Sequence, residues 1–469
     1  MRGGEQVAMK LTRELFVDAH LVRKSTGIRL VCHEPVSAGT AFVFDRPWEG
    51  PFCNYATVVH DSGKVRLYYR GLPVPKHYQG DESLCVAEST DGVQFTRLNI
   101  NTYRQSGTSN NNVIIPDSKC GTHSMGIMLD SRSGVPQSER WKGIGVEQSE
   151  SGSDNQLVAL TSPDGIRWNR VTAGATIKND TGHFAFDSQN VPLWSEAEGK
   201  YLVFGRTWQR GFRWISRWES IDFKSWSASK SMEFYDGDGK PVSDTHYYIN
   251  QFAPYFRAPH ILLGTAARFF PDRQVLSAAE ANEIGIHPSY FKDTSDAVLI
   301  TSRGGTRVQR DLQGVLIRPG IGAANWVSRS NYPACGIIQS ANETMSMYVC
   351  RATGTPSAHL ERLEWPLDRL GSVSVSTKGS FETPDMILPR ADIRLNFSTS
   401  AGGHVLVSVL DTAGRQLPGF GPADAIPLIG DFLSRTILFR KTHLRQLAGR
   451  TIRLRFQIVE ADIYAIEGI

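Results

Sequence analysis

The feature that most constrains the fold is an apolar strand pattern that recurs five times along the chain. The recurring strands are rich in β-branched and aromatic residues, and each begins roughly sixty to eighty residues after the previous one. A small sheet of this kind cannot bury both of its faces alone, so five copies are expected to stack around an axis as a five-bladed β-propeller. The strands are Lys64–Gly71 (KVRLYYRG), Arg140–Val146 (RWKGIGV), Lys200–Arg206 (KYLVFGR), His260–Ala266 (HILLGTA) and Thr344–Arg351 (TMSMYVCR).

A second repeated element combines a Ser, an Asp-Gly pair and an aromatic residue. In such a turn the Asp side chain accepts hydrogen bonds from the following backbone and Gly adopts a positive φ angle. We therefore interpret these segments as hairpin turns of the blades, without a chemical role. They are Glu88–Phe95 (ESTDGVQF), Thr161–Trp168 (TSPDGIRW), Glu219–Trp226 (ESIDFKSW) and, less clearly, Thr301–Val308 (TSRGGTRV).

The pattern changes after about Gly371, where shorter strands alternate apolar and polar residues and are separated by Gly, Pro and Asp turns. This alternation is typical of a β-sandwich of roughly a hundred residues. We therefore predict an all-β protein with a five-bladed β-propeller over residues 1–370 and a β-sandwich over residues 371–469. Helices should be few, and the only helical signal is Ser277–Ile284 (SAAEANEI).

Charge and composition exclude several classes of partner. The net charge is only +4 over 469 residues, and Lys and Arg do not form runs, so no nucleic-acid partner is expected. No stretch approaches the roughly 18 apolar residues of a membrane span. The segment Met1–Asp18 lacks the continuous apolar core of a signal peptide, so we expect a soluble protein that is either intracellular or has lost its leader.

The cysteines give no sign of a metal or redox site. The six residues, Cys32, Cys53, Cys85, Cys120, Cys335 and Cys350, form no C-x-x-C pair and no His/Cys ligand spacing. We expect buried, reduced thiols, no metal and no cofactor.

Five segments carry a resemblance to known proteins. The chain resembles the five-bladed glycoside hydrolases, the group that includes invertases, levanases, arabinanases and β-xylosidases, and it is most similar to bacterial proteins labelled glycosyl-hydrolase-like. The resemblance implies a hydrolase that cleaves a glycosidic bond in an oligo- or polysaccharide. It does not by itself establish a substrate, because one fold supports many functions. The segments are Arg46–Gly50 (RPWEG), Phe186–Asn190 (FDSQN), Tyr255–His260 (YFRAPH), Asn331–Gly336 (NYPACG) and Leu395–Gly403 (LNFSTSAGG).

Glycosidic bond cleavage ordinarily needs two carboxyl groups, which in a propeller must come from different blades. Residues just ahead of each innermost strand reach the central funnel, so we searched there for acids. Asp187 precedes the strand Val191–Trp194 and resembles the acid of the invertase-like enzymes, which implies a general acid with a raised pKa. Glu49 precedes the strand Tyr55–Val59 and is the expected second catalytic carboxylate.

Two positions depart from the invertase-like pattern. Those enzymes have an aspartate ahead of the first inner strand, where this chain has Asn54, and an Arg-Asp-Pro at the second blade, where it has Gly121-Thr122-His123-Ser124. His123 cannot replace that aspartate, although a neutral imidazole can donate a hydrogen bond to a sugar hydroxyl. A retaining and an inverting mechanism both stay open.

The same positional rule selects the expected substrate contacts. Several arginines converging on a funnel would suit a carboxylated or sulfated sugar, so the expected partner is a carbohydrate, neutral or anionic. The candidates are Trp48, Asn54, Arg70, His123, Asn190, Arg206, Asn250, Arg257, His260, Arg329 and Asn331.

Two other functions compete with this hypothesis. The missing second-blade aspartate favours a propeller that binds carbohydrate without catalysis. The turns also suit a sialidase-like enzyme, which would need a tyrosine nucleophile and an arginine triad. A structure discriminates between them, because a glycosidase needs its acids turned toward the axis.

Overall fold

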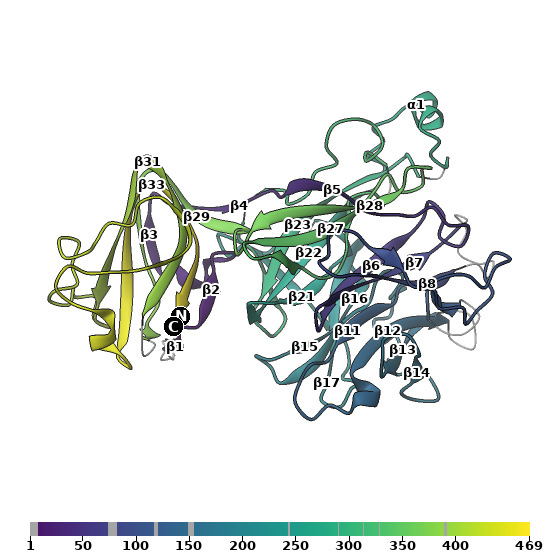
Figure 1. Ribbon diagram of the computed structural model, residues 1–469, viewed down its shortest axis with the longest axis horizontal. Coiled ribbons are helices and arrows are strands. Elements are labelled where there is room, and N and C mark those ends of the chain that lie inside the picture. The colour runs from purple at the N-terminus through teal and green to yellow at the C-terminus, as the bar shows by residue number, and fades with distance from the viewer. Residues whose placement is uncertain are drawn as a thin grey trace.

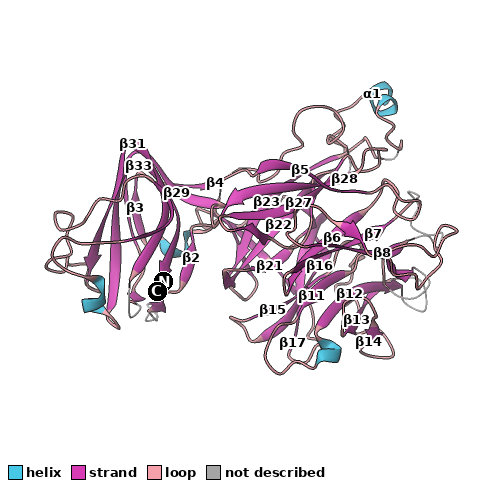
Figure 2. Ribbon diagram, in the orientation of Figure 1, coloured by secondary structure: helices cyan, strands magenta, loops and turns pink. Residues whose placement is uncertain are grey.

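The computed structural model describes residues 8–73, 82–116, 121–148, 154–242, 244–288, 290–312, 314–327, 329–388 and 392–469. This part of the chain is almost entirely β-structure, as Figure 2 shows. Its one α-helix, α1 (Ala278–Glu283), starts after the capping residue Ser277 and confirms the helical turn predicted there. Short 3₁₀ turns, η1 (Ala19–Leu21), η2 (Gln137–Glu139) and η3 (Leu444–Leu447), complete the helical segments of the described residues.

Five separate antiparallel-rich sheets form the propeller, which occupies the right-hand part of Figure 1. Within most of each sheet the strands follow one another outward from the axis, but β19 and β5, which come earlier in the chain, form the outer edges of the fourth and fifth blades. The first blade contains β6 (Asn54–Asp61), β7 (Lys64–Gly71), β8 (Ser83–Ser89), β9 (Thr96–Arg97) and β10 (Val113–Pro116); the second β11 (Gly126–Leu129), β12 (Trp141–Gln148), β13 (Asn155–Ser162) and β14 (Asn169–Arg170); the third β15 (Val191–Ser195), β16 (Lys200–Gln209), β17 (Phe212–Ser220) and β18 (Lys230–Ser231); the fourth β19 (Glu233–Asp236), β20 (His246–Ile249), β21 (Phe252–Tyr255), β22 (Ala258–Phe270), β23 (Thr294–Ser302) and β24 (Arg307–Arg310); the fifth β25 (Tyr332–Pro333), β26 (Ile338–Ala341), β27 (Thr344–Arg351), β28 (His359–Pro366) and β5 (Val36–Val43).

Contacts between the inner strands close the ring. Strand β6 touches β11, β11 touches β15, β15 touches β21, β22 touches β25, and β25 and β26 touch β6. Parallel bridges join Thr57 to Cys335 and Met125 to Asn190 across neighbouring blades. The five-bladed propeller predicted from the repeats is therefore confirmed.

The fifth blade is completed by a strand from the other end of the chain. Strand β5 pairs antiparallel with β28, so that Phe42 lies opposite Leu360 and Val36 opposite Glu364. Figure 1 shows this pair, purple beside green, at the upper edge of the propeller. Hydrogen bonds between residues more than 300 positions apart therefore hold the ring shut.

The second part is one nine-stranded sheet that folds over on itself around a single core, on the left in Figure 1. Its long strands β29, β31 and β33 change register where they bend, and Phe381 stacks on Phe456 at 4.6 Å between ring centroids. The two halves enclose the core as the layers of a β-sandwich do. The strands are β1 (Met9–Lys10), β2 (Arg13–Leu15), β3 (Lys24–Thr26), β4 (Arg29–Cys32), β29 (Gly371–Glu382), β30 (Met386–Ile387), β31 (Ile393–Leu410), β32 (Asp431–Thr436) and β33 (Thr451–Gly468).

The N-terminal strands correct the predicted propeller range of 1–370. Strands β1 to β4 pair with β30, β33 and β29, and the Phe16 ring packs on Phe381 at 5.5 Å. Residues 9–32 therefore belong to the sheet of the C-terminal part. These strands are only two to four residues long, too short for an alternating pattern to reveal their partners.

The repeated turns have the structural role predicted for them. In the first blade the Ser89 hydroxyl accepts a hydrogen bond from the N–H of Gly92, and Asp91 accepts one from the N–H of Val93. Gly92 has a φ of 78°, in the left-handed region that favours glycine. The second and third blades repeat both hydrogen bonds, which leaves these polar side chains occupied within their own turns.

Five of the six cysteines lie in the described residues, and all five are free thiols. Cys120 and the first seven residues of the segment Met1–Asp18 lie outside the described residues. Within the described part of the chain, no helix is long and apolar enough to cross a membrane.

Candidate active site at the propeller axis

Each blade has at least one residue in a left-handed backbone conformation where the chain enters its inner strand. These residues are Tyr55 (φ 54°), Gly121 (φ 58°), Phe186 (φ 66°), Gln251 (φ 48°) and Arg329 (φ 63°). For a residue other than glycine this conformation costs on the order of 1–3 kcal/mol and is concentrated at functional sites. The strained positions mark one end of the axis, which we call the funnel.

Below these residues, two buried glutamines fill the axis. The Gln189 amide group donates to the carbonyl of Tyr55 (2.9 Å) and to the hydroxyl of Thr57 (2.8 Å). Gln251 donates to Gln189 Oε1 (2.8 Å) and to the carbonyl of Pro333 (2.7 Å). The two side chains therefore join four blades and form the floor of the funnel.

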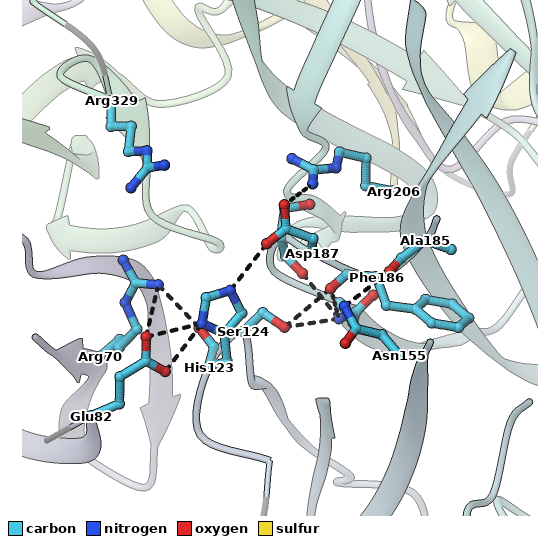
Figure 3. Close-up of polar contacts among 12 residues, drawn as sticks. Arg70, Glu82, His123, Ser124, Asn155, Ala185, Phe186, Asp187, Arg206 and Arg329 are labelled. Carbon is cyan, nitrogen blue, oxygen red and sulfur yellow. Dashed lines mark hydrogen bonds and ion pairs between the residues drawn. The ribbon is translucent and has the colours of Figure 1, made fainter. Parts of the chain in front are cut away.

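A chain of alternating charges crosses the funnel from the first blade to the third (Figure 3). Arg70 Nη1 lies 3.7 Å from Glu82 Oε1, and both Glu82 oxygens lie 3.0 to 3.1 Å from Nδ1 of His123. His123 Nε2 lies 3.2 Å from Asp187 Oδ1, and Arg206 pairs with the other oxygen of Asp187. Five ionisable side chains from three blades thus form one hydrogen-bonded series.

The series is buried at its ends and open at Asp187. The side chain of Asp187 is 37 % exposed and that of His123 20 %, whereas Arg70, Glu82 and Arg206 are almost completely buried. The partly exposed Asp187 carboxylate is therefore fixed by a series of side chains whose ends, Arg70, Glu82 and Arg206, are buried away from solvent. A ligand entering the funnel would meet Asp187 and the edge of His123 first.

The electrostatics favour the ionised form of Asp187. Burial alone would raise its pKa, but the hydrogen bond from His123 and the charge of Arg206 hold the pKa well below its ordinary value. Burial lowers the pKa of His123, and its hydrogen bonds to Asp187 and Glu82 outweigh that effect, so the pKa is raised. Asp187 therefore lacks the raised pKa that the resemblance implied for a general acid.

Arg329 approaches the same space from the fifth blade, opposite Asp187 in Figure 3. Its Nη1 donates to the hydroxyl of Tyr290 at 3.1 Å, and its guanidinium lies 4.8 Å from the centre of that ring. We use the name funnel cluster for Arg70, Glu82, His123, Asp187, Arg206 and Arg329. Its three guanidinium groups outnumber its two carboxylates, which gives the funnel a net positive charge.

Tyr248 lies behind the cluster, against its arginines. Its ring centre is 4.6 Å from the guanidinium of Arg206 and 5.2 Å from that of Arg213. Burial raises the pKa of Tyr248, but the positive charges of Arg329 and Arg206 more than offset this and lower the pKa to about 8. A phenol held in this way ionises far more readily than a free tyrosine.

Glu49 and Trp48 lie elsewhere, inside the first blade. Glu49 is fully buried, pairs with Arg97 at 2.7 Å and accepts a hydrogen bond from the Tyr69 hydroxyl at 2.5 Å. The Trp48 indole donates to Asn112 Oδ1 at 2.8 Å. Both side chains are used in the packing of the blade, so the expected pairing of Glu49 with Asp187 across the funnel needs correction.

The four asparagines expected to contact substrate are also structural. Asn54, Asn190, Asn250 and Asn331 are at most 2 % exposed. Asn54 Oδ1 accepts the N–H of Tyr55, and the other three donate their amide groups to backbone carbonyls of neighbouring segments. They stabilise the strained turns at the funnel, because a buried amide must find hydrogen-bond partners.

Arg257 and His260 lie at the boundary with the second sheet domain. Arg257 Nη1 donates to Asp368 Oδ2 at 2.8 Å, an oxygen that also accepts from Arg13 at 2.7 Å. His260 Nε2 lies 2.8 Å from Glu14 Oε1. These two predicted contacts therefore join the N-terminal strands to the propeller and do not reach the funnel.

Five of the thirteen predicted residues meet in the funnel: Arg70, His123, Asp187, Arg206 and Arg329. Glu82 and Tyr248 were not predicted, because the candidates were residues near the start of the inner strands and two arginines, Arg70 and Arg206, that end equivalent strands in two blades. Glu82 precedes β8, the third strand of its blade counted outward, and Tyr248 lies within β20. In the described residues, no group of three or more His, Cys, Asp or Glu side chains is arranged to hold a metal ion.

No family model matches the sequence, and no curated protein matches it either. Several solved structures are similar to this chain at low sequence identity. One, described as a glycoside hydrolase, has a TM-score of 0.47 at 10% identity, and the alignment covers 71% of this chain and 92% of that chain. An N-acetylgalactosamine deacetylase from F. plautii, in complex with blood group B trisaccharide, has a TM-score of 0.45 at 10% identity, covering 74% and 97%. A glycosyl hydrolase from Bacteroides ovatus has a TM-score of 0.39 at 12% identity, covering 79% and 97%.

Proposed function

We propose that this protein is a glycoside hydrolase that acts on an oligo- or polysaccharide containing an anionic sugar. The observation that carries the proposal is the funnel cluster, in which Arg70, Arg206 and Arg329 surround an exposed, ionised Asp187. The partly exposed Arg329 can bind a carboxylate or sulfate through paired hydrogen bonds, and the buried Arg70 and Arg206 add positive charge around it. A carboxylated or sulfated sugar therefore suits the funnel better than a neutral one.

Asp187 acts in this proposal as the carboxylate that attacks the anomeric carbon or activates a water molecule. Both roles need an ionised group, which agrees with its lowered pKa. Retention and inversion differ only in which of these two roles Asp187 takes.

His123 supplies the proton that the leaving oxygen needs. Its raised pKa favours the imidazolium. When a substrate enters between the two side chains, the Nε2 proton that Asp187 accepts in the free protein passes to the glycosidic oxygen as the bond to the anomeric carbon breaks. Glu82, through its contacts to Nδ1, fixes the orientation of the ring. Glu82 thus takes the place of Glu49 as the second carboxylate, in a positioning role.

A sialidase-like mechanism is the second candidate, and Tyr248 favours it. Sialidases use a tyrosine nucleophile, and Tyr248 has a pKa lowered to about 8 beside the cluster's arginines. Replacing Tyr248 with Phe separates the two mechanisms. Turnover should persist if Asp187 is the working carboxylate and should be lost if the phenolate attacks.

The proposal is tested by screening the purified protein against polygalacturonate, alginate, chondroitin sulfate and sialylated oligosaccharides, followed by the variant Asp187→Asn. The variant should lower kcat/KM by about 10²–10⁴-fold, because the ionised carboxylate is lost. Asp238→Asn, which changes an exposed carboxylate in a surface turn, is the matched control and should behave like the wild type.

Circular dichroism checks that the Asp187→Asn protein is folded. Turnover that survives in a folded Asp187→Asn protein would refute the assignment of Asp187. A wild-type protein that binds one of these glycans without cleaving it would instead support the carbohydrate-binding propeller.

A further inference from the structure

A second cleft of about 500 Å³ lies between the fourth blade and the segment that leads into the fifth. It opens near the funnel end of the fourth blade, because β22 runs antiparallel to β21, which starts just after Gln251 at the funnel. The end of β22 and the start of β23 therefore lie at the funnel end. Residues around the cleft include Phe270, Val275, Pro319 and Trp326 as apolar groups and Arg273 and Thr294 as polar groups.

The lining has the composition of a small-molecule site, with mostly apolar and aromatic surface and few polar groups. The Trp326 indole donates to the carbonyl of Gly320 at 3.0 Å, which fixes the ring, and the side chain is only partly buried. An indole with an accessible face is a surface on which a sugar ring stacks.

A buried hydroxyl in the cleft is unsatisfied. Thr294 is only 5 % exposed, and its Oγ1 has no hydrogen-bond partner among the described residues. A buried polar group without a partner is costly, so native proteins rarely retain one that no ligand or water satisfies.

The charge of the cleft has the same sign as that of the funnel. Asp296 is paired with Arg268, and Arg318 with Glu34 at 2.8 Å. Arg273 is exposed and forms no ion pair within the part of the chain that the structure describes. Arg273 therefore gives the cleft an excess positive charge.

One segment of the chain borders both the cleft and the funnel. Trp326 lines the cleft, and Arg329, three residues later, belongs to the funnel cluster. Ser295, also at the cleft, donates to the carbonyl of Ser330, and its own carbonyl accepts from Asn331 at 2.8 Å. The cleft and the funnel thus lie on either side of the same hydrogen-bonded segment.

We infer that this cleft is a second subsite, which binds a neighbouring unit of the anionic glycan whose reacting sugar lies in the funnel. The inference rests on the proposed function and extends it, because it makes the substrate an oligo- or polysaccharide longer than a disaccharide. The volume is within the range of pockets that hold drug-sized ligands, sufficient for one or two sugar rings.

The test compares short and long probes. Binding of di- and hexasaccharides of polygalacturonate, alginate and chondroitin sulfate is measured by calorimetry in the non-hydrolysing Asp187→Asn protein. Trp326→Ala and Arg273→Ala, each added to that background, should weaken binding of the preferred hexasaccharide by about tenfold and leave the disaccharide within about twofold.

Phe256→Ala is the matched control, since Phe256 is an exposed aromatic residue at the opposite end of the axis. Arg273→Ala keeps the test decisive if Trp326→Ala fails to fold, because Trp326 forms a hydrogen bond to its own loop whereas the Arg273 side chain is exposed.

Unchanged hexasaccharide binding in both cleft variants would overturn the second subsite while leaving the funnel proposal intact. Equal losses for the short and the long probe would also overturn it. Absence of binding to every probe, in the wild type as well as in Asp187→Asn, would count against the proposed function and, with it, the second subsite.

Discussion

Glu49 and Asp187 are both carboxylates bound to arginine, yet their surroundings give them different roles. Glu49 is fully buried against Arg97, with no route to the funnel, whereas 37 % of the Asp187 side chain is exposed. Removing one member of a buried ion pair leaves the other charge without compensation, which costs about 3–5 kcal/mol. Glu49 therefore stabilises the first blade, whereas Asp187 is part of the surface that a ligand can reach.

The variant Glu49→Gln tests this difference. It should lower the free energy of unfolding by about 1–3 kcal/mol, because Arg97 loses its buried counter-charge and keeps only the exposed Asp45, at 2.9 Å, as an acidic partner. Urea unfolding measures the loss, and kcat/KM per folded molecule should stay within about twofold of the wild type. A Glu49→Gln protein that is as stable as the wild type but has no turnover would show that Glu49 is catalytic.

At the scale of elements, the N-terminal segment is attached to the fourth blade by acidic side chains. Asp311 Oδ2 accepts the N–H of Ala19 at 2.7 Å, at the start of η1, and Asp18 pairs with Arg303 at 2.8 Å. Burial raises the pKa of Asp311 to about 6, and the neighbouring charge of Asp18 adds to that effect, although the Ala19 hydrogen bond opposes it. The native protein therefore holds a proton on Asp311 in a pH range where the unfolded chain does not.

This pKa shift predicts a pH-dependent stability. With a pKa near 3.8 in the unfolded chain and about 6 in the native protein, stability should fall as the pH rises from about 4 to 6 and level off above that. Asp311→Asn removes the ionisation and should raise stability at pH 7.5 by about 1–3 kcal/mol, with little gain near pH 4.

The measurement is Tm at half-unit steps of pH, with the exposed Asp272→Asn as control. An increase in Tm of Asp311→Asn over the wild type that is equal at pH 4 and pH 7.5 would show that Asp311 is already ionised in the native protein at pH 4.

Much of this element structure could be predicted from the sequence, and the reasons are local. The Ser89–Asp91–Gly92 turn and the Ser277 cap use hydrogen bonds within three residues, so their pattern is visible in the chain itself. The funnel cluster is different, since Glu82 and Asp187 meet at His123 only after three blades have closed. A periodic pattern locates a strand, but it does not say toward which neighbour a side chain turns.

At the scale of the whole molecule, the N-terminal segment contributes strands to both parts. Strands β1 to β4 lie in the C-terminal sheet, β5 lies in the fifth blade, and Arg13 pairs with Asp368 (2.7 Å) and with Glu467 (2.5 Å). The fully buried Phe16 packs on Phe381 in the common core. The C-terminal sheet therefore lacks a complete set of strands and a closed core within residues 371–469, whereas the propeller strands β5 to β28 are contiguous in the sequence.

A chain ending at residue 370 tests this dependence. The fragment should not fold to a soluble propeller, because β1 to β4 lose their strand partners and the core residues around Phe16 are exposed. Size-exclusion chromatography and circular dichroism should show aggregation or loss of β-structure, and co-expression of residues 371–469 should restore a soluble complex. A monomeric fragment with full β-content would contradict this expectation.

The pairing of β5 with β28 also has a consequence for biosynthesis. During translation β5 is synthesised early, but its partner β28 ends only at Pro366. Strand β5 therefore stays without its partner strand for most of synthesis. Arg70, Glu82, His123 and Asp187 leave the ribosome well before that point, yet nothing locks the blades that position them until β28 arrives. We expect the nascent protein to depend on chaperones that shield this waiting strand, and to acquire its binding surface all at once near the end of synthesis.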